Sequence, residues 1–215
     1  MTRQICTIDR DELRRWIPAG YRPVLHLAAM FGLGAAAIAW LAVADIAHAP
    51  LRHLLLVPAL LLGASLLEYV AHRWVMHARH RLTEPAWAAH VGRHHHYYRA
   101  DAPTWDRARD IWLILFSPID VVALAAIVGG PLALLWHLVG ASDGALVVAT
   151  CVAYFLAYEA LHLTFHLPDG HPLLRVRALA ARRAHHLRHH QLADTHANYA
   201  VVLPLWDRVF GTARG

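Results

Sequence analysis

The chain has 215 residues, of which 58% are hydrophobic and only 16% are charged, and its mean hydropathy is +0.35. This composition lies outside the range of ordinary soluble domains and favours a single membrane domain. The formal net charge is +5, and every basic residue is an arginine. Arginine-rich segments beside apolar helices suit an anionic membrane surface, so no nucleic-acid partner is expected. Cys6 and Cys151 lie far apart in the sequence and indicate neither a disulfide framework nor a redox motif.

The N-terminal segment, residues 1–23, is polar and is expected to lie in the cytoplasm or at the membrane interface. Leu13, Trp16 and Ile17 fall roughly on one helical face, which fits either an interfacial helix or a solvated one. The first apolar run follows at about 24–47. It lacks a small-residue cleavage site, so we expect a retained membrane helix and not a removed signal peptide.

Four apolar runs approach or exceed the roughly 20 residues that cross a bilayer as a helix. After the first, they lie at about 54–74, 111–128 and 145–165. Gly129, Gly130 and Pro131 close the third run, and the apolar residues 131–139 either extend it or lie in the interface. The sequence therefore predicts an all-α integral membrane bundle of about four transmembrane helices, in one domain at residues 24–215.

The arginines are distributed unevenly along the chain. Residues 1–23 hold five, residues 71–109 and 162–215 hold seven each, and residues 129–144 hold none. Positive charge favours the cytoplasmic side, so four spans with both termini in the cytoplasm fit this distribution. An even number of spans also puts residues 71–109 and 162–215 on the same, cytoplasmic face.

Fifteen of the 19 histidines fall in two clusters, each at the end of a long apolar run. The first cluster comprises His72, His77, His80, His90, His94, His95 and His96. The second comprises His162, His166, His171, His185, His186, His189, His190 and His196. Neutral imidazole is the commonest protein ligand for borderline transition metals, and about ten imidazoles suit two ions better than one. The clusters therefore predict a dinuclear metal centre in a histidine-rich helical cap on the cytoplasmic face.

Several of these histidines share a helical face by their spacing. His162 and His166 are four residues apart, and His186, His189 and His190 are spaced by three and four. Such sets can direct several imidazoles toward one ion.

The spacing of His72 and His77 is different. They are five residues apart, about 140° on an ideal α-helix, and could flank one site only if the helix turns or bends. Glu68 precedes His72 by four residues and Glu159 precedes His162 by three. We expect both carboxylates to accept the second ring N–H of a ligand histidine, with a solvated charge at a helix end as the alternative.

The remaining histidines are expected to be bystanders. Four lie alone at or near span ends: His26, His48, His53 and His137. Four others, inside the clusters, are expected to be neighbours of the centre: His80, His171, His185 and His196.

Other protein classes fit the sequence less well. A transition-metal transporter would place its ligands near mid-membrane, whereas these clusters lie at span ends and in polar segments. A haem-binding electron-transfer protein would need only a few histidines, paired across helices. The chain also lacks the H-E-x-x-H, nucleophile-elbow, P-loop and dinucleotide-binding signatures.

Four stretches form a more specific pattern: EYVAHRWVMH (68–77), HVGRHHHYY (90–98), YEALHLTFH (158–166) and HHLRHH…NYAVVLPLWDRVFGT (185–212). Together they cover the region from about 60 to 212. The pattern resembles the fatty acid hydroxylase superfamily, which includes sterol desaturases, sphingolipid and fatty acid 2-hydroxylases, and carotenoid hydroxylases. The ending PLWDRVFGT, after the last histidine pair, is particularly similar to the family.

The resemblance implies that the metal ligands are histidines of the boxes at 72–96 and 162–190. They are His72, His77, His90, His95, His96, His162, His166, His186, His189 and His190. The second box departs from the family pattern, because His94, His95 and His96 stand where a pair is usual. Either His94 with His95 or His95 with His96 is the coordinating pair, and the remaining histidine only forms hydrogen bonds.

The resemblance also implies two iron ions that activate O2, in chemistry centred on the metal with no separate protein nucleophile. Zinc can replace iron in purified protein, since it binds such sites more tightly. The expected substrate is a lipid such as a fatty acyl chain, which is hydroxylated or desaturated. A carotenoid hydroxylase or a sterol desaturase is the alternative within the superfamily. The chain carries no recognisable flavin, haem or cytochrome b5-like segment, so electrons are expected from an external ferredoxin or cytochrome b5-type reductase system.

Overall fold

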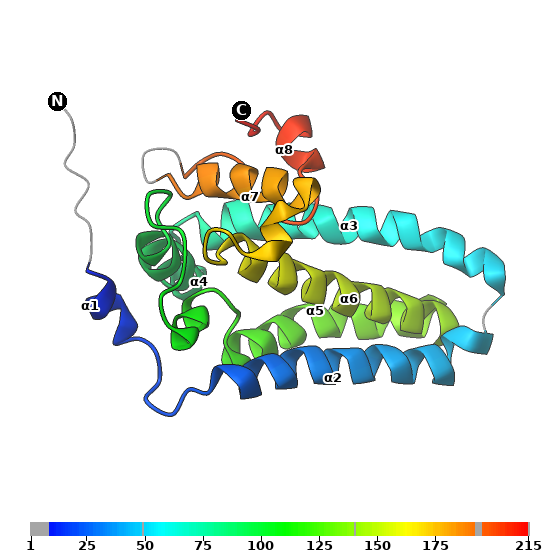
Figure 1. The fold of residues 1–215 in the computed structure, drawn as a ribbon. Coiled ribbons are helices and arrows are strands. Elements are labelled where there is room, and N and C mark those ends of the chain that lie inside the picture. Colours follow the sequence, from blue (N-terminus) through cyan, green and yellow to red (C-terminus); the bar gives the residue numbers. More distant parts are fainter. Residues whose placement is uncertain (1–8, 49, 140, 192–194, 215) are drawn as a thin grey trace. The chain divides into compact units, whose positions relative to one another are not determined.

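The computed structural model describes residues 9–48, 50–139, 141–191 and 195–214. Within these ranges the regular elements are helices, and an isolated bridge joins Arg99 to Ala102 (Figure 1). The all-α prediction is therefore confirmed. The chain forms two compact units. The membrane unit comprises Arg22–Ser65 and Phe116–Glu159, and the histidine unit comprises Met1–Tyr21, Leu66–Leu115 and Ala160–Gly215.

Long apolar helices make up most of the membrane unit. They are α2 (Pro23–Ala44), α3 (Val57–Val70), α5 (Pro118–Val139) and α6 (Ala141–Phe165), with the short 3-10 helices η1 (Ile46–His48) and η2 (Leu51–Leu56) between α2 and α3. Of the described residues, three helical stretches are long and apolar enough to cross a membrane: Pro23–His48, His53–Met76 and Asp143–Phe165. These stretches match the first, second and fourth predicted spans, as expected for a membrane protein.

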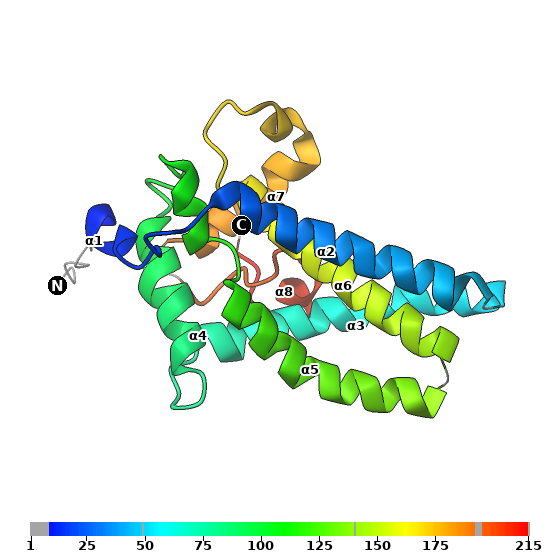
Figure 2. The same ribbon diagram turned by 90° about the horizontal axis from the view of Figure 1, so that it is seen from below.

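Apolar side chains of α2 lie exposed, as they do on a helix that faces lipid. Leu33 and Trp40 are each 72% exposed. Exposure of such side chains to water costs free energy, and a bilayer would remove this cost. On another face, near Gly34, α2 runs alongside α6 (Figure 2). A Cβ atom on Gly34 would lie 2.8 Å from the Leu156 side chain, so the glycine permits this close approach.

The third predicted span is displaced along the sequence. α5 begins at Pro118 and continues through Pro131 to Val139, so the predicted closure at Gly129 is wrong and the alternative, an extended third span, is correct. Pro131 is tolerated because membrane helices accommodate internal prolines. Ala108–Leu113 form the 3-10 helix η5 instead, and Ile111 is apolar because it is buried in the histidine unit. α5 has 22 residues, enough to cross a bilayer, and its crossing stays a prediction.

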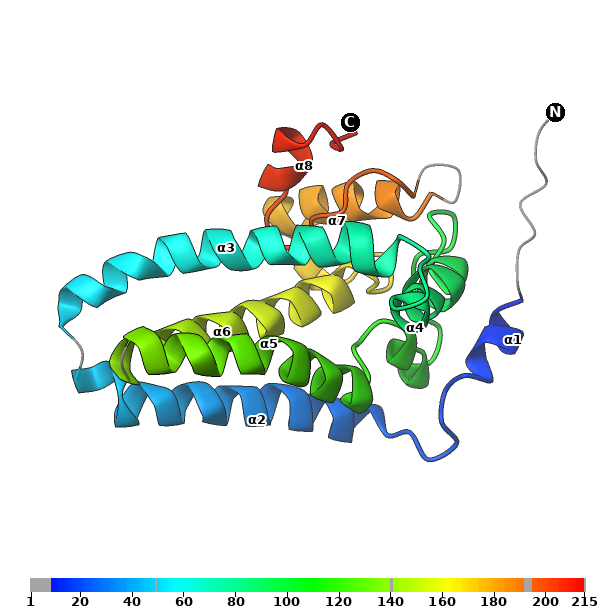
Figure 3. The ribbon, with the colours of Figure 1, turned by 180° about the vertical axis from the view of Figure 1, so that it is seen from behind.

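Shorter elements form the histidine unit. They are α1 (Arg10–Arg14), η3 (Ala71–Met76), α4 (Glu84–Ala89), η4 (His90–His95), η5, η6 (Pro172–Arg175), α7 (Arg177–His189) and α8 (Leu205–Val209). η3 continues directly from α3, at the end of that helix nearest α4 (Figure 3). The Tyr69 ring packs against Tyr199 and Phe210, with ring centroids 5.9 and 5.1 Å away, so the C-terminal segment packs where α3 meets η3.

The helix α1 is tied to the rest of the histidine unit by its arginines. Arg14 forms ion pairs with Asp106 at 2.8 Å and with Asp110 at 3.0 Å. Leu13 is buried, whereas Trp16 is 60% exposed, so the apolar residues predicted to share one face differ in their surroundings. Charged contacts, which no sequence pattern indicated, hold this helix in place.

Candidate metal centre

Ten buried histidines of the histidine unit gather in two groups of five. Group one comprises His72, His77, His90, His95 and His189, and group two comprises His94, His162, His166, His186 and His190. Within each group, one ring nitrogen of every member lies within 4.8 Å of those of the others. No member is more than 8% exposed. Of the eleven histidines considered as ligands, His96 belongs to neither group and is only partly buried.

Two π-helical turns supply four of the five histidines of group one. η3 carries His72 and is capped by His77, and η4 carries His90 and His95. In a π-helix the hydrogen bonds run from residue i to residue i+5, so residues five apart lie about one turn apart on the same face. The His77 N–H donates to the His72 carbonyl oxygen at 3.1 Å in this way. The wide turn thus removes the 140° separation that an α-helix would impose.

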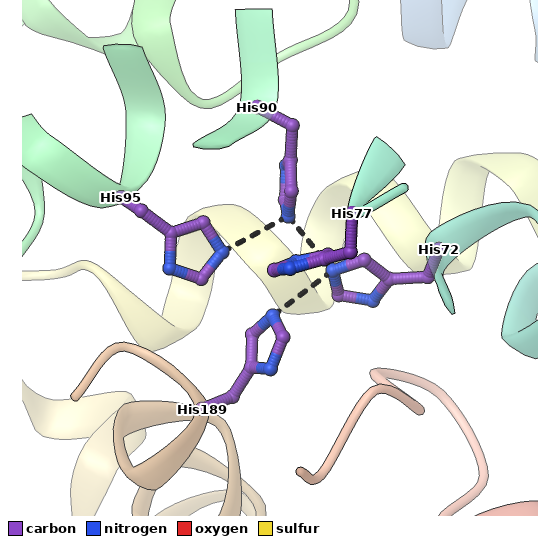
Figure 4. Close-up of side chains that lie close together, drawn as sticks. All are labelled: His72, His77, His90, His95 and His189. Carbon is purple, nitrogen blue, oxygen red and sulfur yellow. Dashed lines mark hydrogen bonds between the residues drawn. The ribbon is translucent and has the colours of Figure 1, made fainter. Parts of the chain in front are cut away.

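The ring nitrogens of group one point toward a common centre (Figure 4). The Nε2 atom of His90 lies 2.7 Å from that of His72 and 3.1 Å from that of His95. The Nε2 atom of His189 lies 3.1 Å from that of His72. The Nε2 atom of His77 is buried and has no hydrogen-bond partner among the described residues. A neutral imidazole has one N–H and one lone pair, so hydrogen bonds among five facing rings pair their inward nitrogens poorly. A bound cation would accept the lone pairs of these nitrogens together.

Ordinary α-helical turns supply four of the five histidines of group two. His162 and His166 lie on α6, while His186 lies on the last turn of α7 and His190 caps that helix. Each pair is four residues apart and shares one face, as predicted. The Nε2 atom of His186 lies 3.1 Å from that of His166 and 3.0 Å from that of His190. His94 completes the group, with its Nε2 atom 3.1 Å from that of His162.

Each group takes its fifth histidine from an element that otherwise serves the other group. His94 comes from η4 but belongs to group two, and His189 comes from α7 but belongs to group one. The imidazole rings of His95 and His190, one from each group, stack with their centroids 4.3 Å apart. The two groups are therefore adjacent within one unit, as a dinuclear centre requires.

Burial keeps the imidazoles of both groups neutral. It is the largest cause of lowered pKa values at His77, His90, His94, His95, His186, His189 and His190, and neighbouring histidines add to the effect. Burial lowers the pKa of His166 to about 3, although its hydrogen bond to a carbonyl opposes the change. A neutral imidazole offers the free lone pair that a metal ion needs.

Backbone carbonyls hold the outward-facing ring nitrogens of four histidines. The Nδ1–H group donates from His189 to Ala197 at 2.6 Å, from His94 to Leu113 and from His166 to Pro103 at 2.8 Å each, and from His72 to Tyr199. A proton fixed on Nδ1 leaves Nε2 as the free donor atom. The chain therefore sets both the tautomer and the orientation of these rings.

The two predicted supporting carboxylates have different partners from those expected. Glu68 accepts hydrogen bonds from the backbone N–H groups of Val201 and Val202. Glu159 accepts from the Phe116 N–H at 3.2 Å, and its Oε1 atom is buried without a hydrogen-bond partner among the described residues. The expectation that Glu68 accepts the second ring N–H of His72 is not met, because that nitrogen is bonded to the Tyr199 carbonyl.

Those histidines predicted as bystanders or neighbours whose side chains the structure describes lie outside both groups. His26 donates to the Phe116 carbonyl, and His185 lies 3.1 Å from a carboxylate oxygen of Asp207. The side chain of His137 is outside the described part of the chain. Two buried aspartates, Asp110 and Asp207, were not singled out by any sequence pattern. Asp207 lies in the PLWDRVFGT stretch, which offered a signal, whereas Asp110 stands in no recognised motif.

Residues 57–212 match the family model described as Fatty acid hydroxylase. Among solved structures, a chain described as "Full length scs7p (only hydroxylase domain visible)" is similar, with a TM-score of 0.61 and 21% sequence identity. The match covers 87% of this chain and 65% of that chain, so this chain spans less than two thirds of the solved relative, and the likeness shows a shared fold. No curated protein matched the sequence. Because the family match covers most of the chain and all ten grouped histidines, this chain belongs to the fatty acid hydroxylase family.

Proposed function

We propose that this chain is a membrane-bound, non-haem di-iron oxygenase that hydroxylates or desaturates a lipid such as a fatty acyl chain. It would use O2 and electrons from an external donor. The observation that carries the proposal is the pair of adjacent, buried five-histidine groups in a chain whose helices are long and apolar enough to cross a membrane.

The donor set suits two borderline transition-metal ions. Group one would hold one ion and group two the other, through imidazole nitrogens alone. Imidazole suits iron, zinc, copper and nickel, and the family match supports iron as the working metal. Bound iron would supply the redox chemistry, namely reductive activation of O2 for attack on an unactivated C–H bond. Zinc bound to purified protein would not exclude iron as the working ion, since zinc has the higher affinity for such sites.

The contribution of the chain itself is positioning and exclusion of water. The ten imidazoles are buried, so the centre is shielded from solvent that would quench reactive oxygen species. Hydrogen bonds from Nδ1 atoms to backbone carbonyls fix four of the rings before any ion binds. The apolar spans suit a lipid substrate, because both would reside in the bilayer.

The class of lipid is the finer part of the proposal. The family favours a fatty acyl chain, and a carotenoid or a sterol is the alternative. Lipid mass spectrometry of cells with and without the gene tests the proposal directly. We expect a lipid that gains one oxygen atom or loses two hydrogen atoms only when the intact gene and O2 are both present. The same product under strict anaerobiosis would contradict the oxygenase and leave a hydrolytic or transport role for the histidines.

Reduction requires a partner, and we propose a ferredoxin or a cytochrome b5-type reductase system on the cytoplasmic face. The arginine distribution supports that orientation for both histidine clusters. Reporter fusions after Arg79 and at the C-terminus should therefore report the cytoplasm, and a fusion after Asp143 the opposite side. Opposite results for the first two fusions would separate the clusters and contradict a shared centre.

A transition-metal transporter remains a distinct alternative that one measurement can separate. Transport needs a ligand set that opens and releases its ion along a pathway. Ten buried histidines in two closed groups, tied by hydrogen bonds to the backbone, favour resident ions instead. Vesicles containing the protein should accordingly show no metal flux above that of empty vesicles.

A further inference from the structure

The carbonyl groups that orient the histidines belong to two segments outside the α-helices, one for each group. The C-terminal segment, residues 197–202, supplies the carbonyls of Ala197 and Tyr199 to group one. The central segment, residues 99–113, supplies those of Pro103 and Leu113 to group two. Outside an α-helix, a carbonyl keeps a fixed direction only when other contacts fix the segment that carries it.

Asp207 fixes the C-terminal segment. Its Oδ1 atom accepts from the Tyr199 N–H at 2.8 Å and from the Thr212 hydroxyl at 2.8 Å. Its Oδ2 atom accepts from the Ala200 N–H at 2.9 Å and lies 3.1 Å from the ring nitrogen of His185. Two of the four donors are therefore backbone N–H groups of the segment, and one belongs to Tyr199, whose carbonyl holds His72.

Asp110 fixes the central segment in the same way. Its Oδ2 atom accepts from the backbone N–H groups of Arg107 at 2.8 Å and Asp106 at 3.2 Å. The Tyr98 hydroxyl donates to the Asp110 carbonyl at 2.8 Å, and the Tyr98 ring lies 4.5 Å from the His166 ring, centroid to centroid. The carboxylate thus braces the segment that carries the carbonyls for His94 and His166.

The helix α1 completes the Asp110 site. Arg14 donates to Oδ1 of Asp110 from Nε at 3.0 Å and to Oδ2 from a terminal nitrogen at 3.1 Å, and it also donates to the Tyr97 hydroxyl at 2.7 Å. Arg10 donates to the carbonyls of Tyr97 and Thr104, at 3.2 and 3.1 Å. The N-terminal helix therefore contacts the central segment at several points.

Both aspartates act as carboxylates despite their burial. Burial alone would raise the pKa of Asp110, but hydrogen bonds from Arg14 and the backbone outweigh it and hold the pKa below its ordinary value. At Asp207, bonds from His185, Ala200 and other donors likewise outweigh burial and lower the pKa. An asparagine has one acceptor oxygen and would turn an N–H donor toward groups that are themselves donors.

We propose that Asp110 and Asp207 are positioning residues, each of which aligns one histidine group by bracing the backbone segment that orients its imidazoles. Asp207 serves group one and Asp110 serves group two, with Arg14 of α1 as part of the Asp110 brace. The inference rests on the proposed function to the extent that both groups hold metal. It predicts that the two aspartates affect the two metal ions separately.

The test measures metal per chain and metal affinity in the purified full-length protein, with helical content from circular dichroism as a check on folding. Asp207→Asn should weaken metal binding at group one, and Asp110→Asn at group two, each by about 10–100-fold, the usual scale for a lost outer partner of a ligand. Each variant should then retain about one tightly bound ion. Asp101→Asn is the matched control, because Asp101 is exposed and pairs with Arg99 in the same segment, and it should retain two ions.

Double variants identify which ion is lost. His166→Ala removes a member of group two, so adding Asp110→Asn should cost little further metal, whereas adding Asp207→Asn should remove the remaining ion. A folded Asp110→Asn protein that holds two ions with unchanged affinity would overturn the proposal. Equal weakening of both ions by either aspartate variant would also overturn it, since that outcome indicates general destabilisation.

Arg14→Gln keeps the test decisive if Asp110→Asn fails to fold. It leaves the aspartate with its backbone donors, so we expect a smaller weakening, confined to group two. Unchanged metal affinity at group two in Arg14→Gln would then contradict the role of Arg14 and Asp110 in aligning that group. A wild-type chain that binds no metal would instead contradict the proposed function, and the two failures are thus distinguishable.

Discussion

The two histidine groups reach similar arrangements by different backbone geometry. Group one uses two π turns, each with its histidines five residues apart, whereas group two uses α-helical turns with histidines four residues apart. In both groups the two histidines are as far apart in sequence as the two residues that a backbone hydrogen bond joins, which is four residues in an α-helix and five in a π-helix. The comparison teaches that an H-x4-H pair can place both imidazoles in one cluster, as an H-x3-H pair does, provided that the helix widens at that point.

The positions of His94 and His189 qualify this contrast, because each belongs to one group while its helix mainly serves the other. Each group depends on one histidine from an element of the other, so the two sites share their supporting elements even though their turns differ. We expect single ligand changes to act mainly on one ion, and changes to the shared elements η4 and α7 to act on both.

Loss of one ligand from either group should have the largest effect. His77→Ala and His166→Ala should each abolish lipid product and lower the bound metal from about two ions to about one, since each leaves one group incomplete. Product analysis and metal analysis of the same preparations check this. His80→Ala, at an exposed histidine three residues from His77, should change neither. If His80→Ala were as damaging as His77→Ala, the grouping would be wrong.

A shifted ligand tests the π turn itself. Met76→His combined with His77→Ala recreates the H-x3-H spacing of group two without changing the length of η3. On the π turn residue 76 lies one residue step around the helix from residue 77, so the new imidazole does not occupy the place of the His77 ring and metal binding should stay as low as in His77→Ala alone. Restored binding in the double variant would show that the spacing of five residues is not required and would remove the contrast between the groups.

The carboxylate before His162 should have an intermediate effect. Glu159→Gln should leave the helical content unchanged and weaken metal binding by about 10–100-fold, the scale for loss of a supporting partner. Glu159 is fully buried on α6, one turn before His162. A change at Glu159 is therefore expected to shift this end of α6 and, with it, the imidazole of His162 in group two. Equilibrium titration with metal provides the measurement, and affinity equal to wild type would remove Glu159 from the account.

The carboxylate before His72 should have the smallest effect. Glu68 accepts from backbone N–H groups, and a glutamine oxygen can still accept from Val201. We therefore expect Glu68→Gln to weaken metal binding at group one by less than about tenfold, below the usual range for a supporting partner. The same titration would contradict this expectation if Glu68→Gln proved as damaging as Asp207→Asn.

Much of the fold was predictable from apolar run length, and part of the centre from histidine spacing. Pro23–His48 and Asp143–Phe165 follow from composition alone, because a bilayer demands length and apolarity. The start of α5 was misplaced because burial in a protein core and burial in lipid select the same residues, as at Ile111. Such runs cannot be told apart by hydropathy.

The finer organisation of the centre is indicated less clearly by the sequence than the spans are. The five-residue spacing of His72 and His77 signalled an irregular turn but not its kind, since an α-helix and a π-helix differ by a single hydrogen-bond register. Carbonyl acceptors such as Tyr199 and Pro103 leave no mark in a sequence, because every residue has a carbonyl. Asp110 acts through tertiary contacts with Arg14, 96 residues away in the chain.

The central claim is that ten histidines form two adjacent metal sites in one chain, and counting the ions in the intact protein tests it most directly. Native mass spectrometry of the full-length chain, purified without chelator and with inductively coupled plasma analysis of the same sample, should give about two transition-metal ions per chain, one for each group. A chain that holds only one ion, or that is active with none, would contradict the account.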